Sequence, residues 1–431
     1  MPDRRMTRRL AAMLATRLDE AQFDEVHDGR DPRGQRWEMK TLLTAVVAAM
    51  VAGAKSLAEA ERVTETLPRA ARRLLGIHRR ISDTTMRDAL GRVEPDDIPK
   101  SLHALVFAAH RRKALRPVDG LPFGVVSLDG KAFSIPGCDD FYAQRQTQGE
   151  KSPLIGVVRT ITATLTSNAA RPCIDVTPVL AHTNEMGSFR HAIDHLAKTY
   201  GHLDLYRMVT YDAGACSVEN ATAVREHNLH YLFGLKGTQP TLYEAAKLWL
   251  GSLSTDQALA TTEDVVGSNT IVRRIYIGPS TEEPEGWAHL RTVLRVESET
   301  LDSGGRGIAH ENRYFVSSLA ADRIAPAQWL LIIRSHWGVE TTHQILDVAL
   351  LEDDHPWIES EPRSALVVAV LRRLVYTMLS LFRSVTQRSD ERRAIPWRQL
   401  LCDIRDSLLI LTEGHLEGLR RRKHQPLLAP A

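Results

Sequence analysis

Five short apolar segments rich in β-branched residues alternate with helical patterns between residues 123 and 236. The strand-like segments are residues 124–129, 154–167, 173–182, 206–212 and 230–236. Helical patterns cover residues 186–200 and 218–228. This alternation is typical of an α/β fold, in which helices cover a largely parallel sheet. We therefore predict an α/β fold for this part of the chain.

The flanking regions show different patterns. Residues 1 to about 120 favour helices throughout, and helical periodicity returns after Pro326. Between about 250 and 322, short strand patterns are separated by Pro, Gly and Ser clusters, which indicates a β-rich insertion. We expect an all-helical N-terminal domain over residues 1–120, and an α/β domain with C-terminal helices over residues 121–431.

Composition gives only broad limits. Lys and Arg total 55 against 53 Asp and Glu, a net charge of +2, so bulk charge neither demands nor excludes a nucleic-acid partner. The four cysteines show no CxxC spacing, which suggests a reducing compartment. The apolar run at 42–54 is shorter than the roughly 20 residues of a membrane span, and no secretory signal pattern is present. We expect a cytoplasmic protein without a membrane partner.

Two of the predicted strands end in an aspartate. Asp129 closes the pattern at 124–129, and Asp212 closes the pattern at 206–212. In α/β sheets the carboxyl ends of strands face the crevice where ligands bind. If the two strands are neighbours, both carboxylates face one crevice. Gly130 directly follows Asp129 and is expected to let the chain turn away there.

Residues 333–348 favour one helix that carries a third acid. Helical spacing predicts a face suited to core packing, formed by Trp337, Thr341, Ile345 and Val348. It places on another face His336, Glu340, His343 and Asp347. That second face is either functional or an ordinary solvated surface, and the spacing alone leaves both readings open.

Three converging acids would suit a hard cation, because Mg²⁺ and Mn²⁺ prefer carboxylate oxygens. Two such ions can clamp the attacking and leaving oxygens of a displacement at phosphorus. Asp129, Asp212 and Glu340 are therefore predicted to hold two Mg²⁺ or Mn²⁺ ions for phosphodiester chemistry. No Ser or Tyr nucleophile is required. Tyr211 is expected to pack on the sheet face opposite Asp212.

The helix predicted after residues 82–85 carries Arg87 and Arg92. Together with the helix and turn before it, this segment fits a helix-turn-helix reader of DNA. It fits an ordinary helical bundle with solvated arginines equally well. The sequence does not choose between these two structures.

Eight segments resemble, in order, the ISAs1 group of bacterial insertion-sequence transposases, part of the wider IS4-like DDE set: residues 50–63, 82–90, 128–133, 182–186, 210–214, 232–239, 311–319 and 334–354. The resemblance runs from about residue 40 to beyond residue 360. It implies an RNase H-like catalytic domain, a mixed sheet with flanking helices, whose DDE triad is Asp129, Asp212 and Glu340. It also implies that the N-terminal helices bind DNA. The partner is then double-stranded DNA, both the element's terminal repeats and the target.

The family pattern assigns supporting positions around the triad, matched here by Arg334, His336, His343 and Asp347. Lys131 is expected to lie near a phosphate. Because two DNA ends must be paired, a homodimer is the natural expectation.

Basic segments are candidates for phosphate contact. They are Arg69, Arg72, Arg73, Arg79 and Arg80 near the N-terminus, Lys236 after the fifth strand, Arg273 and Arg274 in the insertion, and Arg420 to Lys423 in the tail. Each is either a DNA contact or a solvated charge. Trp287 either stacks on a flipped base or anchors the core.

Two other functions remain open. A nuclease of the same fold would cut without rejoining, and the same triad would serve it. A catalytically silent DNA-binding protein derived from a transposase would bind the ends without cutting them. The intact triad argues against the silent protein.

Overall fold

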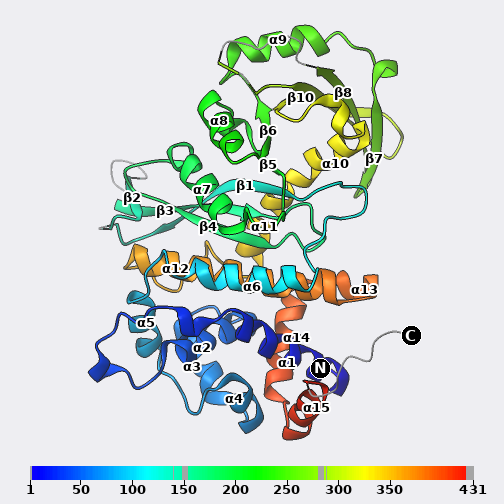
Figure 1. The fold of residues 1–431 in the computed structure, drawn as a ribbon. Helices are drawn as coiled ribbons and strands as arrows, with labels where there is room; N and C mark the ends of the chain where they lie inside the picture. The colour runs from blue at the N-terminus through cyan, green and yellow to red at the C-terminus, as the bar shows by residue number, and fades with distance from the viewer. Residues whose placement is uncertain (1, 139, 148–153, 280–285, 288, 424–431) are drawn as a thin grey trace.

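The computed structural model describes residues 2–138, 140–147, 154–279, 286–287 and 289–423, and it builds them around one mixed sheet (Figure 1). The strand order is β2-β3-β1-β5-β6-β10-β9-β8-β7, and β4 also pairs with β3. The first six strands are β1 (Val125–Ile135), β2 (Ala143–Thr147), β3 (Leu154–Thr164), β4 (Cys173–Val179), β5 (Met208–Tyr211) and β6 (His230–Leu235). The other four are β7 (Ala260–Val266), β8 (Asn269–Pro279), β9 (Thr292–Leu301) and β10 (Gly307–Ser317).

The sheet is mixed, so the expectation of a largely parallel sheet is wrong. Only the β1–β5 and β5–β6 pairs are parallel, and the other pairs of described strands are antiparallel. A parallel return needs a long crossover. The helices α7 (Glu185–Tyr200) and α8 (Val218–Glu226) supply one before β5 and one before β6. The predicted class of a mixed sheet with flanking helices and a helical N-terminal region is confirmed.

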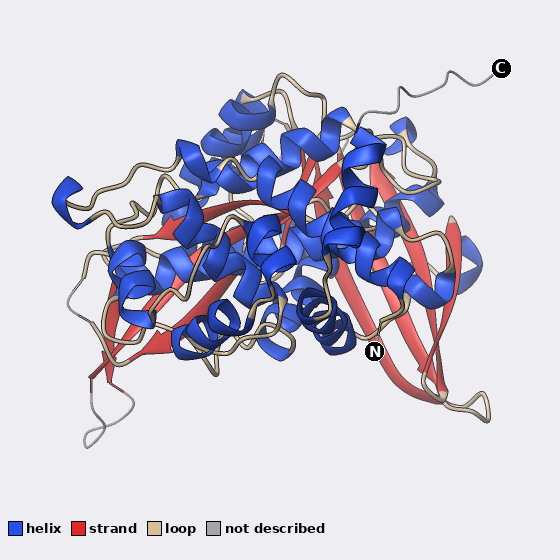
Figure 2. Ribbon diagram, turned by 90° about the horizontal axis from the view of Figure 1, so that it is seen from below, coloured by secondary structure: helices blue, strands red, loops and turns tan. Residues whose placement is uncertain are grey.

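The predicted β-rich segment forms β7 to β10 and extends the central sheet, because β10 pairs with β6. Helix α9 (Pro240–Leu250) precedes it and packs against β8 and β9. The strand ends project beyond the helices on two sides of the molecule (Figure 2).

Helices fill the N-terminal region, as predicted. They are α1 (Arg4–Glu20), α2 (Met39–Val51), α3 (Leu57–Thr66), α4 (Arg69–Leu75), α5 (Asp83–Gly91) and α6 (Pro99–Arg111). The side chains of Ser56 and Ser82 accept backbone hydrogen bonds at the starts of α3 and α5, as N-caps do.

The C-terminal helices return to this region. Helix α14 (Trp397–Leu409) and helix α15 (Glu413–Lys423) contact α1, and the short α13 (Asp390–Arg393) lies between α12 and α14 in the chain. The helix α12 (Pro362–Leu381) contacts β3 and β4 as well as α2, α5 and α6, so it joins the sheet to the helical layer (Figure 1).

Helix α12 also explains a membrane-like segment. Residues Pro362–Thr386 are long and apolar enough to cross a membrane, yet the apolar window is entirely buried inside the protein. Such burial is typical of a core helix. The apolar run at 42–54 falls largely within α2, whose residues from Leu42 to Val51 are also buried.

Candidate active site

The parallel pairing of β1 and β5 brings two of the predicted acids together. Ser127 lies opposite Thr210 in the register, and their hydroxyl oxygens are 2.7 Å apart. Side chains two residues apart on a strand point to the same face. Asp129 and Asp212 are each two residues further on, so their carboxylates leave the same face at the same level. The condition set by the sequence, that the two strands be neighbours, is met.

Asp129 does not end its strand, however. β1 continues to Ile135, and Gly130 pairs with Ile161 of β3. The predicted turn at Gly130 is therefore wrong. The antiparallel β3 supports β1 well past the point where β5 ends at Tyr211. Where β5 stops, Asp212 caps a short 3-10 helix by accepting the N–H of Gly214 at 2.8 Å.

The predicted helix at 333–348 is two helices, α10 (Pro326–His336) and α11 (Gly338–Val348), joined at Trp337. Thr341 and Val348 are exposed, whereas the buried residues of α11 include Val339, Thr342 and Leu346. The predicted core face is therefore wrong for Thr341 and Val348, but Trp337 and Ile345 are partly buried and pack against the core.

Glu340 lies on α11, which packs against β1 and β3. Partial desolvation raises the pKa of Glu340, and the negative charge of Asp129 and, to a smaller extent, of Asp212 raises this pKa further. Arg313 and His343 act in the opposite direction. These interactions place the third acid within the electrostatic reach of the other two.

Two of the predicted supporting histidines contact this site. His343 Nδ1 lies 3.2 Å from Asp129 Oδ2, and its Nε2 is buried without a hydrogen-bond partner among the described residues. His336 Nδ1 lies 2.8 Å from Thr210 Oγ1, so the end of α10 is tied to β5. Burial lowers the pKa of His336, although Asp129 and Asp212 oppose this shift.

Lys131 and Asp347 contact each other. The Lys131 Nζ lies 2.6 Å from Asp347 Oδ1 and 3.1 Å from Asp353 Oδ1. Behind them Glu352 is fully buried and pairs with Arg373. The expected contact of Lys131 with a phosphate is wrong for this arrangement, because its side chain is 7% exposed and is held by carboxylates.

A further acid, Glu185, lies near this site, although no strand end or helical face in the sequence marks it. Its carboxylate lies directly over Gly130, where an added Cβ would collide with all three of its carboxylate atoms. Burial raises the pKa of Glu185, and Asp129 and Asp212 raise it further, whereas Arg159 and His343 lower it. Glu185 belongs to the segment at 182–186 that resembles the transposase family.

Most of the basic candidates have partners within the protein. In the insertion Arg273 pairs with Asp264, and Arg274 pairs with Glu299. Arg334 of α10, one of the predicted supporting residues, pairs with the same Asp264. Near the N-terminus, Arg72 donates to the carbonyl oxygens of Leu67 and Glu65, Arg73 pairs with Glu413, Arg80 pairs with Glu61, and Arg79 lies over the Trp37 ring.

Lys236 is different, because it is exposed and its side chain makes no hydrogen bond or ion pair with the described residues. Arg69, Arg87 and Arg92 are also exposed. The side chains of Arg420 to Lys423 lie outside the described part of the structure. Arg87 on α5 and Arg92 at its C-cap fit a DNA reader and a helical bundle alike.

Two aromatic side chains are packed in the core. Trp287 is 5% exposed and lies against Tyr231. Of the two roles that the sequence left open, the structure therefore favours a core anchor. Tyr211 packs against Phe189 of α7 and is buried. It therefore lies on the face opposite Asp212, as predicted.

The donor set of the acid site suits a hard divalent cation. Asp129 on β1, Asp212 just after β5 and Glu340 on α11 supply carboxylate oxygens, the ligands that such a cation prefers. Among the described residues, these three acids do not have their oxygens within 4.8 Å of one another. A different group of described residues, His103, Asp175 and His195, has its ligand atoms within 4.8 Å of one another. There each imidazole already contacts a separate oxygen of the Asp175 carboxylate, at 2.8 and 2.7 Å, so that cluster is explained by hydrogen bonds.

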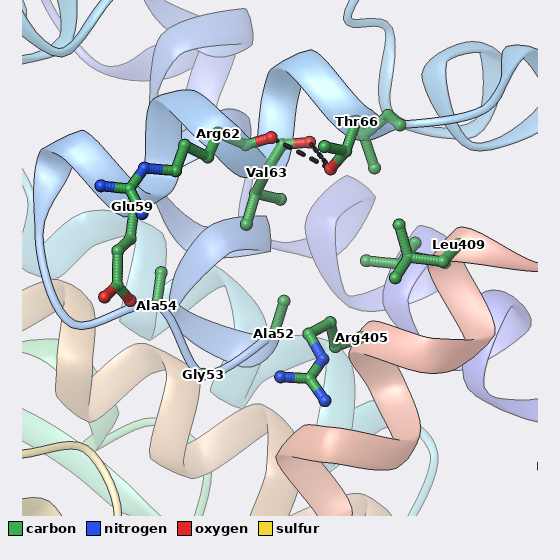
Figure 3. Close-up of a pocket in the computed structure, with 11 residues that line it drawn as sticks. Ala52, Gly53, Ala54, Glu59, Arg62, Val63, Thr66, Arg405 and Leu409 are labelled. Atoms are coloured by element: carbon green, nitrogen blue, oxygen red, sulfur yellow. Dashed lines mark hydrogen bonds between the residues drawn. The ribbon is translucent and has the colours of Figure 1, made fainter. Parts of the chain in front are cut away.

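A pocket lies far from these acids in the helical region (Figure 3). It is formed by α3, α14 and the segment between α2 and α3, and its lining includes Ala52, Val63, Leu409, Arg62 and Arg405. None of the three predicted catalytic acids lines it.

Comparison with known proteins adds evidence for the N-terminal region. Residues 21–106 match the family described as DDE_Tnp_1-associated. A search of curated proteins found no match. Among solved structures, the chain is similar to the cryo-EM structure of a piggyBac transposase synaptic complex with hairpin DNA, at 12% identity and a TM-score of 0.41, covering 99% of this chain and 83% of that one. Helices α2 to α5 and part of α6 therefore form a region of the kind associated with DDE transposases.

Proposed function

We propose that the protein is a DDE transposase of an insertion sequence, of the ISAs1 type, which cuts DNA at the element's ends and joins them to a target. The observation that carries this proposal is the parallel pairing of β1 and β5, which brings Asp129 of β1 beside the chain that continues from β5 to Asp212. Glu340 follows from α11 in the order that a DDE triad requires. The transposase-associated match at residues 21–106 is independent support.

In this proposal Asp129, Asp212 and Glu340 hold two Mg²⁺ or Mn²⁺ ions. When bound, the ions lower the pKa of the attacking water or DNA 3′-hydroxyl and stabilise the leaving oxygen. The protein's part is positioning. His343 orients the Asp129 carboxylate, and His336 ties α10 to Thr210, so that α11 starts at a fixed place beside the acids.

DNA approaches the same edge of the sheet in this proposal. Lys236 follows β6, and the segment after it packs on the chain just beyond Asp212, since Thr238 Oγ1 donates to the Ala213 carbonyl at 3.4 Å. An exposed ammonium without a protein partner next to the acid site suits a phosphate of the DNA backbone.

The test is Mg²⁺- or Mn²⁺-dependent cleavage of DNA that carries the ends flanking the reading frame. We expect the native protein to cut, and Asp129→Asn, Asp212→Asn and Glu340→Gln to bind the DNA without cutting it. Glu219→Gln, which changes an exposed acid on α8, is the matched control. Equal cleavage by the native protein and all three variants would overturn the proposal.

Two other outcomes would select the rival functions. Cleavage without any joined product under conditions that supply target DNA indicates a nuclease. Binding of the ends by the native protein without cleavage under either metal indicates a silent DNA-binding protein.

We further propose that two copies act together on a pair of ends in the bacterial cytoplasm, because one active site serves one end. Light scattering of the complex with paired-end DNA should give the mass of two chains. The mass of one chain on a paired complex that still joins DNA would contradict this.

A further inference from the structure

Glu185 is placed at the acid site by the start of α7. Asn184 is the N-cap, and its side chain accepts the Gly187 N–H at 2.9 Å, so the backbone at 185 is fixed. The helix packs against β3 and β4. Its first residue therefore extends toward β1 at the level of Asp129.

The approach of Glu185 depends on Gly130. A Cβ at position 130 would overlap the Glu185 carboxylate. Gly130 pairs with Ile161 as an ordinary strand residue and does not have a positive φ, so backbone conformation does not require a glycine there. The close approach of a carboxylate is the structural reason for the missing side chain.

Glu185 is half-buried and has no hydrogen-bond or ion-pair partner among the described residues. Other acids close to the site are compensated. Asp347 pairs with Lys131, and Glu352 pairs with Arg373. A half-buried carboxylate without a partner costs free energy, and a bound cation would remove that cost.

We propose that Glu185 is a fourth carboxylate of the acid site and helps to hold the divalent cation bound at Asp129. This inference rests on the proposed function. Glu185 is a metal-positioning residue in this scheme, and the proposed triad keeps its roles. The lone acid of the motif at 182–186 thereby receives a function.

Direct metal binding tests this inference without relying on cleavage. Mn²⁺ binding to the full-length protein is measured from the electron paramagnetic resonance signal of free Mn²⁺. We expect Glu185→Gln to weaken binding roughly 10-fold or more, the effect typical of altering a metal's supporting groups. Glu219→Gln is the matched control, because it also removes an acid from the first turn of a helix, and it should bind as the native protein does.

A second variant disturbs the Glu185 carboxylate without changing Glu185 itself. Gly130→Ala should displace Glu185 and weaken Mn²⁺ binding by a similar factor. The double variant should be no weaker than the worse single variant, because both changes remove one interaction. Thermal unfolding of each variant without metal shows whether it is folded. Fully additive losses would overturn the inference, since the two residues would then act separately.

The outcomes separate this inference from the proposed function. If the native protein binds Mn²⁺ and Asp129→Asn abolishes that binding, the acid site stands. Native-like binding by Glu185→Gln then rejects the fourth carboxylate alone. If Asp129→Asn binds as tightly as the native protein, the metal site itself is wrong and both proposals fail.

Discussion

The Lys131 ammonium lies 2.6 Å from the Asp347 carboxylate and so joins β1 to α11. Asp129 is two residues before Lys131 in β1, and Glu340 is in the same helix as Asp347. The ion pair therefore fixes the distance between two of the proposed catalytic elements. Its structural role replaces the phosphate contact that the sequence suggested.

Lys131→Met should destabilise the protein by about 2 kcal/mol, between the values for an exposed and a buried ion pair, because Lys131 is buried whereas Asp347 is partly exposed. Glu352 keeps its pair with Arg373 in this variant. Urea unfolding measures the change. Lys247→Met, which removes an exposed pair with Glu244, should cost less than about 1 kcal/mol. Equal losses of unfolding free energy in the two variants would show that the ion pair at Lys131 contributes no more than an exposed pair.

The sequence predicted the strands around the site because their β-branched runs are long and clear. It did not predict that β1 passes through Gly130, since a glycine after an acid resembles a strand end, and only pairing with β3 carries the strand on. It also missed the break at Trp337, because no proline marks it. Gly338 follows, packed so closely on Arg171 that an added Cβ would lie 2.9 Å from the Arg171 Cδ.

The candidate site was predictable only in part. Asp129 and Asp212 could be identified because each follows an apolar run. Glu185 could not, because its approach to Gly130 arises from the packing of α7 on the sheet. The partners of Arg273 and Arg334 were hidden for the same reason, since Asp264 is brought to both by tertiary structure.

The stability of the protein should depend on pH through His195. The hydrogen bond to Asp175 raises the pKa of His195, although burial opposes it. Because the folded protein binds this proton more tightly, the stabilisation is complete below the unfolded pKa of about 6.5 and is lost as pH rises through the folded pKa. This stabilisation persists to low pH, because the two histidines, acting against desolvation, hold the pKa of Asp175 well below its usual range.

His195→Gln should therefore lose more free energy of unfolding at about pH 5.5 than at about pH 8.5. Denaturant unfolding at the two pH values measures this difference. His227→Gln, which alters an exposed pair with Asp194, is the control and should show a smaller difference. A loss for His195→Gln that does not change with pH would contradict the prediction.

Glu340→Gln should slightly stabilise the protein when no metal is present. The raised pKa of Glu340 means that its charged form is disfavoured in the folded state, so the cost is full at neutral pH and disappears as pH falls below the unfolded pKa of about 4.3. Because the side chain is exposed and screened, the gain should be under about 1 kcal/mol. Thermal unfolding with a chelator at two pH values measures it.

Addition of Mg²⁺ should make the native protein more stable than Glu340→Gln. A ligand that binds only the folded state stabilises it in proportion to its affinity, and Glu340→Gln is expected to bind the metal less well than the native protein. Native protein that melts at the same temperature with and without Mg²⁺ or Mn²⁺ would count against the acid site.

Lys236 offers the sharpest test of where DNA lies. Its ammonium is exposed beside the segment that follows Asp212 and has no partner among the described residues, whereas Arg80 is paired with Glu61 on the N-terminal helices. If Lys236 neutralises a phosphate, Lys236→Ala should weaken binding of all DNA sequences alike and lower the slope of log K against log salt by about 1. Arg80→Ala is the comparison, and its slope should stay closer to that of the native protein. An unchanged slope for Lys236→Ala together with a reduced slope for Arg80→Ala would move the DNA from the sheet edge to the helical region.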